Sequence, residues 1–266
     1  HAENLRDITK AMMAKGKGIL AMDESNGTCD KRFQKVGIQT SVDKRRDYRE
    51  MILTTPNLGD YISGAILYDE TIRQMSRDGK PLVKICQEAG IIPGIKVDMK
   101  AKDLASFPGE KVTEGLDGLR DRIAEYYEMG ARFAKWRAVI AIGENIPSHA
   151  CVEANAHALA RYAALCQEGG LVPIVEPEVL IDGNHSIARC FHITDATLHS
   201  VFNQLHTQGV ALDRMVLKPS MVISGKDCPE QASVQEVATF TVRCLLRNVP
   251  ALVGGVAFLS GGQTPE

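Results

Sequence analysis

Residues 171–178 read Leu-Val-Pro-Ile-Val-Glu-Pro-Glu, a short apolar run that ends in two carboxylates. A run this short and this rich in β-branched residues predicts a strand over 171–175 that is covered on both faces, as strands of parallel sheets are. Residues 215–219, Met-Val-Leu-Lys-Pro, repeat the pattern and end on a lysine. These stretches decide the fold, because each places ionisable groups where a buried strand ends.

The same pattern extends over the whole chain. Further apolar runs predict strands over 18–22, 61–67, 91–97, 133–142, 215–217 and 252–259. Between them, apolar residues recur at helical spacing over 116–126, 152–163, 198–205 and 234–245, with Thr194 as the expected N-cap of the third helix. Alternation of strands and helices predicts an α/β fold with a parallel sheet, but counting strands leaves both a doubly wound sheet and a (β/α)₈ barrel open.

Composition excludes several classes of protein. The 266 residues carry 31 Lys and Arg against 33 Asp and Glu. The net charge of −2 therefore offers no excess of positive charge for binding nucleic acid or an anionic membrane surface. Apolar residues make up 44% of the chain, and no apolar stretch is long enough to span a bilayer. The seven cysteines are scattered without a C-x-x-C pair, which favours free thiols in a reducing compartment.

Charged and polar groups gather at the carboxyl ends of the predicted strands. They are Asp23-Glu24, Lys96-Val-Asp98, Lys135-Trp-Arg137, Glu176-Pro-Glu178, Lys218-Pro219 and Ser260-Gly-Gly262. In a barrel these ends form the one face on which active sites are built. Taken singly, Asp98, Arg137 and Glu178 are interpreted as solvated charges.

Lys218 resists that interpretation, because Met-Val-Leu precedes it and Pro-Ser-Met-Val follows it. A buried ammonium is costly, so this lysine is either ion-paired or an amine whose pKa is depressed by burial and by a cation such as Lys135. A neutral amine attacks carbonyls and forms a Schiff base, and Glu176 and Asp23 are candidates for the proton transfers. Lys96, Lys135, Arg137 and the Ser260-Gly261-Gly262 loop suit a substrate with phosphates.

With these motifs the chain resembles the class I fructose-1,6-bisphosphate aldolases. The matching segments are Gly-Lys-Gly-Ile-Leu-Ala-Met-Asp23-Glu-Ser25-Asn-Gly-Thr28, Gly-Ile-Lys96-Val-Asp98, Ala-Lys135-Trp-Arg137, Val-Pro-Ile-Val-Glu176-Pro-Glu178, Val-Leu-Lys218-Pro-Ser-Met-Val and Phe-Leu-Ser260-Gly-Gly-Gln. They occur in the family's order along the whole chain. The resemblance implies a (β/α)₈ TIM barrel and a cytoplasmic, homotetrameric lyase that uses no metal or other cofactor.

The resemblance also implies residue roles. Lys218 matches the Schiff-base lysine, Glu176 the glutamate that exchanges protons, Asp23 the aspartate near the C4 hydroxyl and Lys135 a lysine that orients substrate; Glu178 joins this catalytic set. Ser25, Thr28, Lys96 and Arg137 match positions that bind the six-phosphate, and Ser260 and Gly261 match the loop for the one-phosphate. The expected partner is a small sugar bisphosphate, with neither nucleic acid nor membrane.

The family continues with an eighth strand and a C-terminal tail, whereas this sequence ends at Glu266. We therefore expect residues 1–266 to form a single barrel domain truncated at its C-terminus.

Three other functions stay open at this point. They are another Schiff-base sugar-phosphate aldolase or transaldolase, a non-catalytic scaffold on the same fold, and a zinc enzyme. The zinc enzyme is disfavoured because His185, His192, His199 and His206 are seven residues apart, which is about 10.5 Å along a helix and too far for shared ligation.

Overall fold

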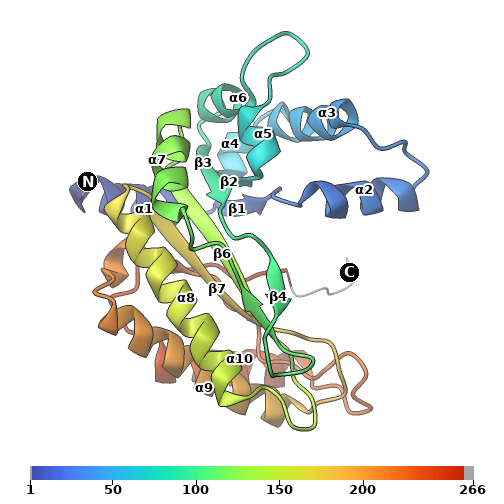
Figure 1. Ribbon diagram of the computed structural model, residues 1–266, viewed down its shortest axis with the longest axis vertical. Coiled ribbons are helices and arrows are strands. Elements are labelled where there is room, and N and C mark those ends of the chain that lie inside the picture. The colour runs from blue at the N-terminus through green and yellow to red at the C-terminus, as the bar shows by residue number, and fades with distance from the viewer. Residues whose placement is uncertain (1, 261–266) are drawn as a thin grey trace.

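The centre of the molecule is a curled parallel sheet of seven strands in the order β1-β2-β3-β6-β7-β8-β9 (Figure 1). This computed structural model describes residues 2–260, with side chains from Asn4 onward. The strands are Gly18–Ala21 (β1), Ile62–Leu67 (β2), Ile92–Lys96 (β3), Phe133–Ile140 (β6), Val172–Val179 (β7), Val216–Leu217 (β8) and Gly255–Val256 (β9). All neighbours are parallel, which confirms the predicted α/β class and the barrel-type arrangement.

Helices cover the outer face of this sheet, and α8, α9 and α10 pack on one another in sequence order (Figure 1). The helices are Ala2–Met12 (α1), Asn26–Lys35 (α2), Val42–Leu53 (α3), Leu58–Tyr61 (α4), Asp69–Arg73 (α5), Leu82–Glu88 (α6), Leu119–Met129 (α7), His149–Glu168 (α8), Ile187–Thr207 (α9) and Val234–Asn248 (α10). A short 3₁₀ turn at Leu212–Arg214 precedes β8. No helix within residues 2–260 combines the length and apolar character that a membrane span requires.

Several predicted boundaries are wrong. Strand β7 runs to Val179, so Glu176 and Glu178 lie inside the strand rather than after it. Thr194 is not an N-cap, because α9 begins two turns earlier, where the Ser186 side chain accepts the backbone N–H of Arg189. Thr194 is buried within the helix, on the same apolar face as the residues after it.

The hairpin of Ala101–Asp103 (β4) and Lys111–Thr113 (β5) was not predicted. Its strands are three residues long and mostly polar, so neither period nor hydrophobicity marks them.

Side chains of β6 alternate between the two faces of the sheet. Trp136 points outward and stacks on Tyr162 of α8 with ring centroids 5.4 Å apart. Phe133, Lys135 and Arg137 share the opposite face, which is the inside of the curl. Along this column the residues change from apolar at the amino end to charged at the carboxyl end, and Ile174, Glu176 and Glu178 of β7 repeat the change. The inner face therefore has an apolar floor and a charged rim.

The floor is filled by the ring of Phe133, which contacts Gly94 on the neighbouring strand β3 and Gly64 on β2, the strand beyond it. A Cβ atom built on Gly94 would lie 2.2 Å from this ring, and one built on Gly64 would lie 2.9 Å from it. Leu5 and Met12 of α1 pack into the same inner cluster and close it from the amino end. Glycine is needed here because the ring occupies the space of a side chain.

Gly94→Ala is therefore expected to destabilise the fold by about 1–3 kcal/mol, the usual cost of overpacking a dense core. The measurement is the free energy of unfolding in urea. Gly18→Ala in β1 is the matched control, because a Cβ there meets no atom within 4 Å. Equal stability of the two variants would show that the ring moves aside at little cost.

Candidate functional site

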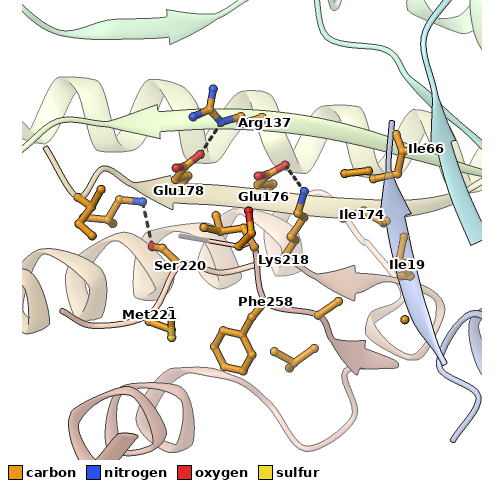
Figure 2. A pocket seen from close by; sticks show the side chains of 18 of the residues that line it. Ile19, Ile66, Arg137, Ile174, Glu176, Glu178, Lys218, Ser220, Met221 and Phe258 are labelled. Carbon is orange, nitrogen blue, oxygen red and sulfur yellow. Dashed lines mark hydrogen bonds and ion pairs between the residues drawn. The ribbon is translucent and has the colours of Figure 1, made fainter. Parts of the chain in front are cut away.

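Lys218 follows β8 directly and points to the inside of the sheet, where it faces Glu176 of β7 (Figure 2). Its Nζ lies 3.4 Å from Oε2 of Glu176, and the side chains are 15% and 4% exposed. Of the two states that the sequence left open for Lys218, the structure shows the ion pair. The only described carboxylate within ion-pair distance of this amine is Glu176.

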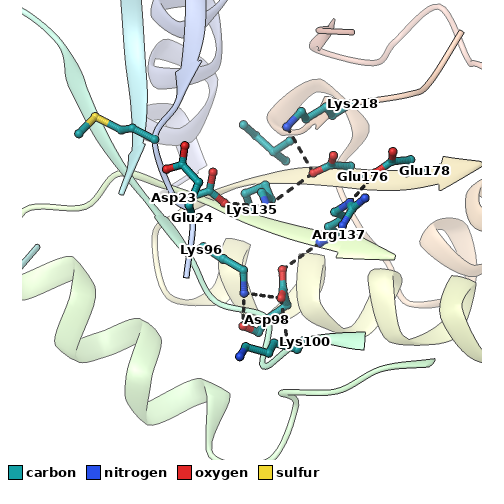
Figure 3. Close-up of polar contacts among 12 residues, drawn as sticks. Asp23, Glu24, Lys96, Asp98, Lys100, Lys135, Arg137, Glu176, Glu178 and Lys218 are labelled. Atoms are coloured by element: carbon teal, nitrogen blue, oxygen red, sulfur yellow. Dashed lines mark hydrogen bonds and ion pairs between the residues drawn. The ribbon is translucent and has the colours of Figure 1, made fainter. Parts of the chain in front are cut away.

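Lys135 lies on the other side of the same carboxylate. Its Nζ is 2.7 Å from Oδ2 of Asp23 and 3.8 Å from Oε2 of Glu176. The four side chains thus form a row of alternating charge, Asp23–Lys135–Glu176–Lys218 (Figure 3). Each comes from a different strand or from the residues that follow it, and 195 positions separate Asp23 from Lys218.

Burial raises the pKa of Glu176 above its ordinary value, although attraction to Lys135 and Lys218 opposes the shift. Burial on its own would lower the pKa of Lys135, but Asp23 and Glu176 outweigh it and the pKa is raised. Lys135 is therefore held as a cation, while Glu176 can take up a proton more readily than a solvated glutamate. A carboxyl group with these properties beside an amine suits general acid–base catalysis.

The turn that carries Asp23 is held by Arg49 of α3. The Arg49 side chain is 2% exposed. Its guanidinium donates to the carbonyls of Met22 and Glu24 at 2.9 Å each and lies 3.2 Å from the Glu24 carboxylate. These contacts fix the backbone on both sides of Asp23. Arg49 was not predicted from the sequence, since nothing in the local pattern of α3 distinguishes it from the neighbouring arginines.

The interpretation of Asp98 and Glu178 as solvated charges is wrong. Asp98 is buried and binds Nζ of Lys96 at 2.6 Å, while its other oxygen accepts the backbone N–H of Arg137 at 3.1 Å. Glu178 is paired with the Arg137 guanidinium, which is half-exposed. Side chains two residues apart on a strand point to the same face, so Lys96 and Asp98 lie on the same side. This spacing is the sequence evidence from which their ion pair could have been predicted.

Ser25 and Thr28 lie at the amino end of α2. Ser25 is the N-cap, and its Oγ lies 3.4 Å from the backbone nitrogen of Thr28 and 3.1 Å from the Thr28 hydroxyl. Together with Lys96 and Arg137 these hydroxyls line a cavity of about 550 Å³. Hydroxyls, a helix N-terminus and cations are the groups that bind phosphate.

A second cavity of about 860 Å³ contains Lys218, Glu176 and Glu178 (Figure 2). Asp23 and Lys135 line the first cavity and Glu176 and Lys218 line the second, so the charged row extends from one to the other, and Ser260 and Arg137 line both. Gly261 lies outside the described residues. Across residues 2–260, no group of three or more His, Cys, Asp or Glu side chains is arranged to hold a metal ion.

Comparisons with known proteins agree on one family. The family model described as fructose-bisphosphate aldolase class-I matches residues 4–266. A Xanthomonas campestris protein named "Probable fructose-bisphosphate aldolase class 1" is 64% identical over 264 residues, which is 99% of this chain and 79% of that protein. An Arabidopsis thaliana protein named "Fructose-bisphosphate aldolase 4, cytosolic" is 51% identical over 94% of this chain and 64% of its own length.

Among solved structures, the fructose-bisphosphate aldolase from Plasmodium falciparum, crystallised with TRAP and a small-molecule inhibitor, superposes with a TM-score of 0.97. Its sequence is 45% identical, and the match covers 98% of this chain and 76% of that one.

Proposed function

Because this chain belongs to the class I fructose-bisphosphate aldolase family, we propose that Lys218 forms the Schiff base through which this family reversibly cleaves fructose 1,6-bisphosphate into dihydroxyacetone phosphate and glyceraldehyde 3-phosphate. The observation that carries the assignment is the row Asp23–Lys135–Glu176–Lys218, in which the Lys218 amine lies at one end against the protonatable carboxyl group of Glu176. A transaldolase or a scaffold protein is less well supported, since every relative described above is named an aldolase.

The first half of the reaction uses Lys218 and Glu176. Transfer of a proton from the ammonium to Glu176 leaves a neutral amine, which attacks the C2 carbonyl and forms the C–N bond of a carbinolamine. Glu176 then returns a proton to the C2 hydroxyl, which leaves as water and produces the protonated imine. The distance of 3.4 Å between Nζ of Lys218 and Oε2 of Glu176 supports a proton transfer between these two groups.

In the second half the C3–C4 bond breaks and its electron pair moves to the imine as an enamine. Asp23 is proposed to take the proton of the C4 hydroxyl, so that glyceraldehyde 3-phosphate leaves as an aldehyde. Protonation at C3 and hydrolysis of the imine then release dihydroxyacetone phosphate. Lys135, held between Asp23 and Glu176, would keep both carboxylates in position and offset their charge.

The two cavities suit the two phosphate groups of the substrate. We assign the six-phosphate to Ser25, Thr28, Lys96 and Arg137, and the one-phosphate to the loop of Ser260 and Gly261. Glu178 is assigned to the catalytic set through its pairing with Arg137.

A cytosolic homotetramer is part of the same proposal, supported by the family and by the cytosolic aldolase from Arabidopsis thaliana. We also propose that residues 1–266 belong to one barrel domain, since the described sheet is continuous from β1 to β9.

The direct test is to incubate the protein with fructose 1,6-bisphosphate and measure both triose phosphates, with and without EDTA. Cleavage is expected at the same rate in both samples, because the imine supplies the electron sink. Loss of cleavage in EDTA and its return with zinc would reassign the reaction to metal-assisted chemistry.

A further inference from the structure

Five cations line the cavity of Ser25 and Thr28, and four of them have a carboxylate partner. The pairs are Arg32 with Glu24, Lys96 with Asp98, Lys135 with Asp23 and Arg137 with Glu178. Lys100 is the fifth, and it has no carboxylate within 4 Å among the described residues (Figure 3). The positive charge that is not already compensated in this cavity therefore belongs to Lys100.

The backbone at Lys100 is held in an unusual conformation. Its φ is +74°, in the left-handed region that favours glycine. The backbone N–H of Lys100 donates to Oδ1 of Asp98 at 3.2 Å, and its carbonyl accepts the N–H of Glu114 at 3.1 Å. The carboxylate that binds Lys96 thus also fixes Lys100 beside it. At this φ a lysine makes the folded state less stable than a glycine would. The presence of lysine here therefore indicates a role of its side chain other than stabilising the fold.

We infer that Lys100 is a specificity-determining residue that binds the substrate phosphate remote from Lys218. The inference rests on the proposed function and adds to it a residue that the motifs did not include. Lys96 must share its charge with Asp98, whose oxygen is 2.6 Å away, whereas Lys100 can give its whole charge to an anion. Lys100 should therefore contribute to the preference for a sugar with a second phosphate over a sugar with one.

Affinity is best measured in a background that cannot form the imine, Lys218→Met. Calorimetry with fructose 1,6-bisphosphate and with fructose 1-phosphate compares a ligand that has the remote phosphate with one that lacks it. Adding Lys100→Met should weaken binding of the bisphosphate about threefold to tenfold, as expected for a charge contact at an exposed rim, and leave the monophosphate unchanged. The difference should shrink in 1 M salt, where screening is strong.

Two further variants separate charge from structure. Lys100→Gly removes the same charge in a backbone conformation that glycine prefers, so it should weaken bisphosphate binding as Lys100→Met does. Lys102→Met is the matched control, because Lys102 is exposed on β4 and does not line the cavity; it should change neither affinity.

Equal losses for both sugars, no loss, or wild-type affinity in Lys100→Gly would overturn the inference, as would a parent protein that does not prefer the bisphosphate. If the expected losses are found but the wild-type protein fails to cleave the bisphosphate, the proposed function is wrong and Lys100 keeps its role as an anion-binding residue.

Discussion

Replacing Lys218 by methionine is expected to lower the rate of cleavage of fructose 1,6-bisphosphate by about 10³-fold or more. Methionine keeps the apolar stem and its packing but has no amine, so neither the carbinolamine nor the imine can form. Loss of a covalent nucleophile removes a whole reaction path rather than one contact, which is why the effect exceeds that of a single hydrogen bond.

The same experiment locates the covalent bond. Incubation with dihydroxyacetone phosphate and sodium borohydride reduces the imine to a stable secondary amine, which peptide mass spectrometry can map. The adduct is expected on Lys218 and not on Lys17 or Lys226, two lysines that line the same cavity. An adduct on either of those, or activity that survives in Lys218→Met, would refute the assignment of the nucleophile.

Glu176→Gln is expected to reduce kcat by about 10²–10⁴-fold, the range in which general acid–base groups contribute. The amide has the size of the carboxyl group but cannot exchange protons with Lys218. It also leaves the two lysines that share this carboxylate without their common partner. A loss of less than tenfold would mean that another group moves the proton.

A surface glutamate is the control for this variant. Glu168→Gln at the end of α8 removes an exposed partner of Arg120 and should leave kcat unchanged. Thermal unfolding of both variants distinguishes lost catalysis from lost structure.

The stability of Glu176→Gln should also depend less on pH. Because burial raises the pKa of Glu176, the folded protein binds this proton more tightly than the unfolded chain does. The wild-type free energy of unfolding therefore falls as pH rises from the ordinary value of 4.5 to the raised value. The glutamine variant lacks that contribution, so its urea midpoint should change less over the same interval.

The fold was predictable from the sequence because its evidence is local. Short apolar runs need cover on both faces, so alternating strands and helices can pack only as an α/β sheet. The boundaries that were wrong are those where local evidence misleads. Pro177 and the charges beside it resemble a strand end, yet β7 continues to Val179, which still pairs with Ile140 of β6. Thr194 resembles an N-cap, but it lies within α9, on the face of that helix that is buried.

The residue types at the site were also visible in the sequence, as charges at the ends of buried strands. Only the tertiary structure decided their partners, because Coulomb attraction depends on distance in space and the row joins residues that lie in or just after four separate strands. It also showed that Arg49 holds the turn of Asp23, that Asp98 is buried between Lys96 and Arg137, and that Lys100 keeps its charge free. In the cavity of Ser25 and Thr28, ion pairs compensate four of the five cations. Which of these cations can act on a substrate is therefore set by the folded chain, which pairs the others with carboxylates and leaves Lys100 without a carboxylate partner among the described residues.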